Sequence, residues 1–196
     1  MSIRIRNSWL FAATLAAPLV LWSADATPAK EIDTQKSTMT VRVFKTGLFS
    51  AFGHDHEISA PIRQGSVNET DRSVNLIVDA RQMRVMDKDV SEKDRAEIQE
   101  TMLGPKVLDT AQFPEIRFHS TSAERADERH WTVHGELTLR GKTRPMKVEV
   151  NGASGRYRGT AELKQRDFGI EPVSVGGGTV KVKDELRVEF EIVAKP

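Results

Sequence analysis

The stretch WTVHGELTLRGKTRPMKVEV, residues 131–150, decides the fold class of this chain. Apolar residues alternate with polar ones on both sides of the triplet Arg140-Gly141-Lys142. Strands with one face toward a core and the other toward water produce this period of two. A short glycine-containing turn between two such runs is typical of a hairpin. The stretch therefore predicts two neighbouring antiparallel strands.

The same alternation recurs on both sides of this hairpin. The further runs lie at residues 39–43, 74–78, 116–121, 157–163 and 186–193. Asn151-Gly152 is expected to begin another turn, directly after the quoted stretch. Short strands in series with close turns predict an all-β meander, which either closes as a barrel or stacks as a sandwich. Alternation alone does not separate these two architectures.

One segment breaks the period of two and favours a helix. Ser91 is a suitable N-cap, and acidic residues follow it in the first turn. Gly104-Pro105 is a suitable stop. Between them Ala96, Ile98, Met102 and Leu103 can share one face. We therefore expect a helix of about three turns, inserted between strands and able to cover one end of a barrel.

Composition excludes several classes of protein. The chain has 196 residues, of which 38% are hydrophobic and 29% charged, so it fits one globular domain. The formal net charge of +1 argues against nucleic acid as a partner. Cysteine is absent from the sequence, which excludes thiolate catalysis, cysteine zinc sites and disulfide scaffolds.

The first 26 residues have the layout of a signal peptide. Arg4 and Arg6 precede a mostly apolar stretch at residues 9–22, and Ala24-Asp25-Ala26 offers small residues where signal peptidase cleaves. We expect cleavage after Ala26 and export. The alternative is an uncleaved anchor, but the apolar stretch is short for a span of about 20 residues and contains Pro18.

The chain after the signal peptide divides into two parts. Residues 27–37 are polar and are expected to form an N-terminal linker, and residues 38–196 are expected to form the folded domain. No later stretch is long and apolar enough to span a membrane, so we expect no stable insertion after cleavage.

The cluster GHDHE, residues 53–57, is the most unusual candidate site. On a strand, His54 and His56 point to the same face and could bind a divalent metal or a polar head group, with His119 or His134 as a further ligand. The alternative is that the pair satisfies backbone groups and carboxylates. Zinc sites need three or four ligands and only two are evident, so we predict no metal. Hydrolase and phosphate-binding motifs are absent.

A second candidate segment is RDFGI, residues 166–170. Arg166 could bind an anionic ligand group or pair with Asp167. The alternative is a structural turn with Phe168 buried beneath it. Of the two, we favour the structural turn.

Four motifs, in this order and spacing, resemble the YceI-like family of periplasmic polyisoprenoid-binding proteins. The resemblance extends from about Ser37 to the last strand. The motifs are FGH at 52–54, FPEIRFHS at 113–120, GELTLRGKTRP at 135–145 and RDFGI at 166–170. The triplet His54-Asp55-His56 and the short glycine-rich loop between Ile170 and Val180 depart from the commonest family pattern.

The resemblance implies a lipocalin-like, eight-stranded antiparallel β-barrel with an inserted helix and an apolar tunnel. It implies a periplasmic binding or carrier protein for a polyisoprenoid, an isoprenoid quinone or a similar lipid, without enzymatic activity or a cofactor. A second copy of the chain is an open alternative as a partner. The polar candidates at the tunnel mouth are His54, His56 and Arg166. The expected lining is Met39, Val41, Val43, Val74, Leu76, Val78, Phe118, Trp131, Val133, Leu137, Phe168 and Phe190.

Two alternatives to a lipid carrier are retained. The first is a metal-assisted enzyme that uses His54 and His56 at the barrel mouth. The second is a stress-related structural protein whose apolar faces fill one another completely. An interior without a cavity would favour the second alternative.

Overall fold

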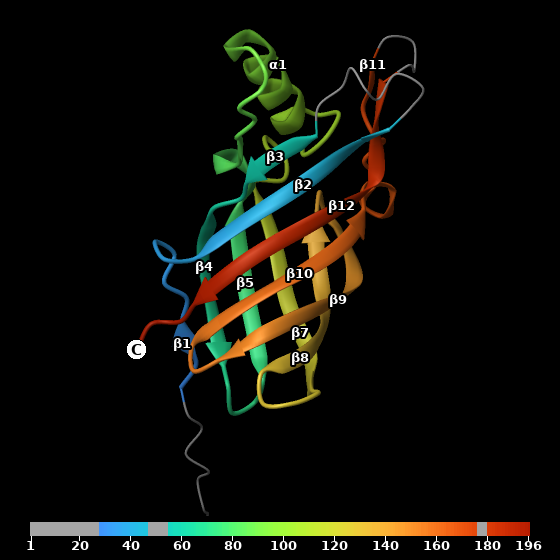
Figure 1. Ribbon diagram of the computed structural model, residues 1–196. Coiled ribbons are helices and arrows are strands. Elements are labelled where there is room, and N and C mark those ends of the chain that lie inside the picture. The colour runs from blue at the N-terminus through green and yellow to red at the C-terminus, as the bar shows by residue number, and fades with distance from the viewer. Residues whose placement is uncertain (1–27, 47–54, 176–179) are drawn as a thin grey trace, which may run out of the picture.

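The computed structural model describes residues 28–46, 55–175 and 180–196, and they form one curled antiparallel sheet with one α-helix. Figure 1 shows β2, β12 and β10 crossing in front of β4, β5 and β7. The long strands are β2 (Thr38–Thr46), β4 (Ile62–Asn68), β5 (Ser73–Asp79), β7 (Glu115–Arg125), β8 (His130–Leu139), β9 (Lys142–Ala153), β10 (Arg156–Lys164) and β12 (Val180–Val193). The short elements are β1 (Lys30–Glu31), β3 (His56–Ser59), β6 (Arg84–Val85), β11 (Ser174–Val175), η2 (Ala80–Gln82), η3 (Gln165–Phe168) and α1 (Glu92–Leu103).

The sheet closes on itself through β3 and β4, which act as one bent strand. β3 pairs with β2, and the backbone N–H of Ala60 extends this ladder by donating to the Met39 carbonyl at 2.9 Å. After Pro61, β4 pairs with β5 instead. Proline cannot donate to a ladder and fits this change of partner. Counted with that bent strand, eight antiparallel strands enclose the barrel: β2, β3–β4, β5, β7, β8, β9, β10 and β12.

The hairpin predicted from residues 131–150 is confirmed. β8 and β9 pair up to Leu139 and Lys142, which leaves a two-residue turn. Arg140 and Gly141 both have positive φ, 49° and 69°, as a type I′ turn requires. The expected turn at Asn151-Gly152 is wrong. β9 continues through it, and the chain reverses at residues 154–155, where both φ angles are positive.

The inserted helix is also confirmed, with the predicted ends. Ser91 caps α1 through its Oγ, which accepts the backbone N–H of Asp94 at 3.1 Å, and Gly104 ends the helix. The Gln99 side chain accepts the backbone N–H of Val85 and donates to the carbonyl of Met83. These bonds fix α1 over one end of the barrel (Figure 1).

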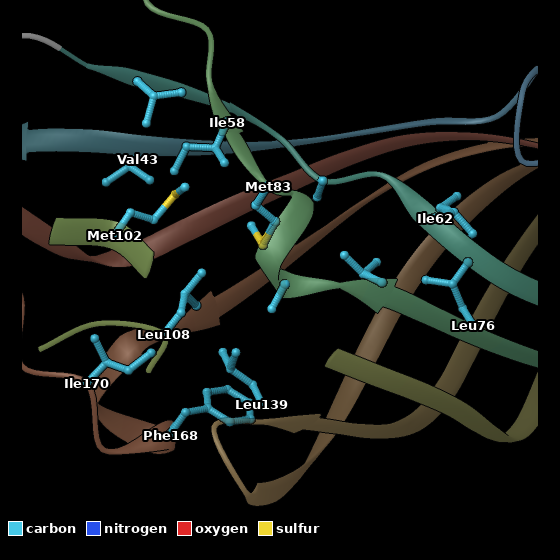
Figure 2. Close-up of a cluster of buried hydrophobic side chains, with 14 of the residues drawn as sticks. Val43, Ile58, Ile62, Leu76, Met83, Met102, Leu108, Leu139, Phe168 and Ile170 are labelled. Carbon is cyan, nitrogen blue, oxygen red and sulfur yellow. The ribbon is translucent and has the colours of Figure 1, made fainter. Parts of the chain in front are cut away.

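A packed apolar cluster fills the barrel end beneath α1. Phe168 and Ile170, from the segment after β10, are only 2% exposed. Met102 of α1 and Leu108 of the following turn pack against them, together with Val43, Ile58, Met83 and Leu139 (Figure 2). The excursion between β5 and β7 and the segment after β10 therefore together close this end.

Part of the segment expected to be a linker belongs to the barrel. β1 pairs with β4, and Ile32 is 2% exposed. The Ile32 backbone donates to the carbonyl of Gly65, whose missing side chain leaves room for the isoleucine. A Cβ at Gly65 would lie 2.6 Å from the Ile32 Cδ1 atom. Burial of the Ile32 side chain therefore fixes this otherwise polar segment to the barrel.

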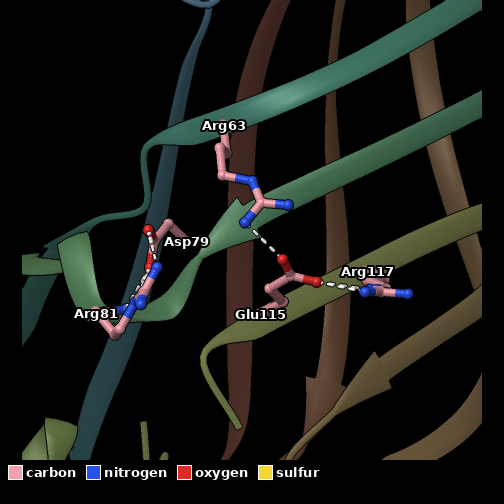
Figure 3. A network of polar contacts seen from close by, with 5 residues as sticks. All are labelled: Arg63, Asp79, Arg81, Glu115 and Arg117. Atoms are coloured by element: carbon pink, nitrogen blue, oxygen red, sulfur yellow. Dashed lines mark hydrogen bonds and ion pairs between the residues drawn. The ribbon is translucent and has the colours of Figure 1, made fainter. Parts of the chain in front are cut away.

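Ion pairs connect the strands on the outer surface. Glu115 of β7 pairs with Arg117, its neighbour on the same strand, and with Arg63 of β4, each at 2.5 Å (Figure 3). Beside them Arg81 pairs with Asp79. The hydrogen bond from Arg117, followed by Arg63, lowers the pKa of the Glu115 carboxyl below its ordinary value. Such solvent-exposed pairs contribute little to the stability of the fold.

Candidate ligand-binding cavity

The inward faces of the barrel strands enclose a cavity of about 480 Å³. This volume lies within the range of small-molecule sites in proteins. Along most of its length the cavity is lined by aliphatic and aromatic side chains. Such a lining favours an apolar ligand, because a polar ligand group buried there would lack hydrogen-bond partners.

Ten of the twelve side chains expected to line the tunnel do line this cavity. They are Met39, Val41, Val74, Leu76, Val78, Phe118, Trp131, Val133, Leu137 and Phe190. Val43 and Phe168 instead lie in the packed cluster beneath α1. Val43 shares the parity of Met39 and Val41, but it lies farther along β2, at the end that the core fills. That any of the ten contacts a ligand stays a prediction.

Apart from the charged residues of the rim, sequence reasoning missed apolar lining residues of two kinds. The first kind has the same strand alternation and could have been found from it. It includes Val67, Ile116, Leu139, Met146, Val148, Val150, Tyr157, Ala161, Leu163, Leu186, Val188 and Ile192. The second kind, Met83 and Leu108, comes from the irregular excursion between β5 and β7. These two residues lie outside the alternating strands, so the sequence pattern does not identify them as inward-facing.

Two glycines keep the large aromatic rings against the barrel wall. A Cβ at Gly135 would lie 2.5 Å from the Phe118 ring, and one at Gly159 would lie 2.6 Å from the Phe190 ring. Both phenylalanines line the cavity. Glycine within a strand allows this close approach, so both rings can lie close to the wall.

The open rim of the cavity lies at the end opposite α1. Its charged residues come from the β4–β5 turn, from the last residue of β7 and from the β7–β8 turn. They are Glu69, Arg72, Arg125 and Glu128, all of them exposed, and Ser154 of the β9–β10 turn joins them. Figure 1 shows these turns together, far from α1. A cavity that the core closes at one end thus opens at the other.

Hydrogen bonds give the rim a defined geometry. The Tyr157 hydroxyl donates to the Glu69 carboxylate at 2.5 Å, and the Gly155 backbone N–H donates to the same oxygen at 3.1 Å. Burial, followed by the hydrogen bond and charge of Glu69, raises the pKa of Tyr157 to about 12. The indole N–H of Trp131 donates to the Gly152 carbonyl at 3.2 Å.

The polar residues expected at the mouth lie elsewhere or cannot be placed. His54 and the FGH motif at 52–54 fall outside the described residues. His56 lies on β3 near α1, and its Nδ1 is 2.6 Å from the Asp87 carboxylate. Arg166 pairs with Glu171 and lines a separate polar hollow with Lys181 and Glu185. Both residues lie away from the open rim, because β3 and η3 belong to the end beneath α1.

The expected third ligands do not join His56. His119 and His134 lie on the outer faces of β7 and β8, and the Nδ1 of His119 is 2.7 Å from the Asn75 side-chain oxygen. Within the three described ranges, no group of three or more His, Asp or Glu side chains is placed to hold a metal ion. No helix in those ranges is long and apolar enough to cross a membrane.

An antiparallel meander closed around an apolar cavity, with one filled end and one open end, defines a lipocalin-like binding barrel. The comparison with known families agrees with this class. The family model described as the YceI-like domain matches residues 31–194, so the chain belongs to the YceI-like family.

Similar proteins occur in several bacteria. A UPF0312 protein of Shewanella putrefaciens is 27% identical over 93% of this chain and 95% of its own length. A UPF0312 protein of Pseudomonas savastanoi pv. phaseolicola is 35% identical over 56% of this chain and 54% of its own length.

Two solved structures share the fold. BcnA of Burkholderia cenocepacia has a TM-score of 0.60 at 19% identity, over 84% of this chain and 99% of BcnA. A YCEI protein of Campylobacter jejuni has a TM-score of 0.52 at 11% identity, over 71% of this chain and 81% of that protein. At these identities the likeness extends to the fold alone.

Proposed function

We propose that this protein binds an amphiphile with a long apolar tail, such as a polyisoprenoid or an isoprenoid quinone, and carries it in the periplasm. The cavity is the observation that carries the proposal, because it is apolar along its length and polar only at its rim. The role is binding and transport rather than catalysis. A solid-core structural protein is disfavoured, because the barrel interior contains a cavity of about 480 Å³.

Burial of the tail supplies enough free energy for this role. Each buried methylene contributes about 0.8 kcal/mol, so one isoprene unit contributes roughly 3–4 kcal/mol before costs. Micromolar affinity requires about 8 kcal/mol net, and association costs at least ~4 kcal/mol. About three or four buried units are therefore sufficient, and the head group need only be tolerated at the rim.

The periplasmic location rests on the export signal and the family. Residues 1–26 are proposed to be removed after export, leaving a chain whose folded domain begins shortly after the cleavage site. Mass spectrometry of the intact protein from a periplasmic extract checks this directly. Its mass should correspond to a chain that begins at Thr27. A mass that includes residues 1–26 would contradict the cleavage.

The ligand itself is tested by extraction and by binding. The mature chain, purified under native conditions, is extracted with organic solvent and the extract is analysed by mass spectrometry. We expect a lipid with a long apolar tail. The delipidated protein should then bind added geranylgeraniol in a fluorescence competition assay. An empty extract together with no binding of added isoprenoids would overturn the proposal.

A further inference from the structure

Two arginines flank one aromatic ring at the rim of the cavity. Trp131 begins the inward face of β8, and its indole N–H is fixed by the Gly152 carbonyl. The guanidinium carbon of Arg125 lies 5.2 Å from the centre of the Trp131 ring, and that of Arg72 lies 5.9 Å from it. All three side chains also line the cavity. The rim therefore gathers two positive charges around an aromatic surface.

Neither guanidinium pairs with a carboxylate of the described residues. Arg125 donates through Nε to the Asp127 carbonyl at 2.8 Å and through Nη2 to the Glu128 carbonyl at 2.9 Å. These are backbone oxygens, so they position the guanidinium without neutralising its charge. Arg72 forms no ion pair in the described part of the chain.

The acidic residues of the rim do not neutralise these charges by direct pairing. The Glu69 carboxylate accepts the Tyr157 hydroxyl and the Gly155 backbone N–H. The Glu128 carboxylate also lines the rim, but it pairs with neither arginine within the described residues. The two guanidinium groups thus retain donors that can bind an anion.

We propose that Arg72 and Arg125 bind the anionic head group, a phosphate or a carboxylate, of an amphiphile whose tail fills the cavity. The inference rests on the proposed function, because the tail must occupy the cavity for the head group to reach the rim. A charged head group stays at the rim since its burial in the apolar interior is unfavourable. Guanidinium groups match phosphate and carboxylate oxygens with paired hydrogen bonds.

The test compares two ligands that share one tail. Geranylgeranyl monophosphate and geranylgeraniol are titrated into the delipidated mature chain at low and high salt, below the concentrations at which they aggregate. We expect the phosphate to bind about tenfold more tightly at low salt, and the preference to shrink at high salt. Inorganic phosphate alone should not displace either ligand at matched concentration, because it lacks the tail.

Variants assign the preference to the two arginines. Arg72→Gln should lose most of the preference for the phosphate, measured as the ratio of the two affinities in the same variant, and Arg72→Lys should retain part of it. Arg125→Gln should act in the same way, but it also removes bonds to the backbone of the turn, so Arg72→Gln is the cleaner test. Arg158→Gln is the matched control, since Arg158 lies exposed on β10 and pairs with Glu191.

The outcomes separate this inference from the proposed function. Equal affinity for the alcohol and the phosphate, or a preference that survives loss of both arginines, would overturn the anionic head group and leave the cavity ligand intact. Displacement by inorganic phosphate alone would show that the rim binds free phosphate, which also overturns the inference. If neither lipid binds, the proposed function itself fails.

Discussion

The ring of Phe190 lies against the backbone of Gly159, its direct partner across the β10–β12 pair. A Cβ at Gly159 would lie 2.6 Å from the ring and 2.3 Å from the Glu149 carbonyl oxygen. Gly159→Ala must therefore displace the ring, the backbone or both. We expect a loss of about 1–3 kcal/mol in the free energy of unfolding, which denaturant titration measures.

A control for this loss lies on the same strand. Thr160 is exposed on the outer face of β10, and Thr160→Ala should change the stability by no more than about 0.5 kcal/mol. Unchanged stability of Gly159→Ala would contradict the close approach of ring and backbone.

Narrowing the cavity should weaken binding without unfolding the barrel. Ala161 is buried and lines the cavity, so Ala161→Phe places a ring where the tail of the ligand would lie. We expect the affinity for geranylgeraniol to fall by at least about tenfold, as several buried methylenes are lost. Thr160→Phe adds the same ring to the outer face and should bind as before. Equal affinity of the two variants would place the ligand outside this cavity.

The Asp87 carboxylate fixes β3 to the segment that leads into α1. One of its oxygens accepts the Glu57 backbone N–H at 2.7 Å, and the other lies 2.6 Å from Nδ1 of His56. The Asp87 side chain is only 4% exposed. Asp87→Ala leaves both partners without a bond and should destabilise the protein by about 1–3 kcal/mol. Asp89→Ala, at an exposed position two residues away, is the control for the thermal melts.

The titration of Tyr157 can be read directly, because it is the only tyrosine in the sequence. Ultraviolet absorbance of the phenolate should give a midpoint of about 12 in the folded protein, against about 10 for an unfolded chain. Because the folded pKa is the higher one, the stabilising contribution is complete below about pH 10 and is lost as the pH rises toward about 12.

Glu69→Gln separates the two causes of this shift. Removing the charge should move the midpoint back toward about 10 but not fully, since burial is the larger cause. A folded midpoint of about 10 in the unsubstituted protein would contradict the position of Tyr157 at the rim.

The fold was predictable because its determinants are local. Alternation along residues 131–150 specifies two strands, and Arg140-Gly141 specifies the turn between them. Ser91 and Gly104 specify the ends of α1 for the same reason. The same alternation identifies the inward faces, and hence ten of the lining residues.

The position of the rim was not predictable from these patterns. A period of two distinguishes the two faces of a strand but not its two ends, so it could not place Val43 in the core or Arg72 at the rim. Which end the core fills depends on Met102 and Leu108, which belong to the excursion between β5 and β7. Arg72 lies in the β4–β5 turn, where no alternation marks it. Arg125 ends β7, where a bulge between Ser120 and Ser122 has changed which residues face inward.

The packed apolar cluster beneath α1 determines by which end of the barrel a ligand can enter and leave. Within the described residues the cavity reaches solvent at the rim of Arg72 and Arg125, so the tail of the proposed ligand would enter first and leave last. Loading and unloading then follow one route in opposite directions. Under the proposed function, a donor or acceptor of the lipid would then face the turns opposite the helix, with α1 on the side turned away from the exchange.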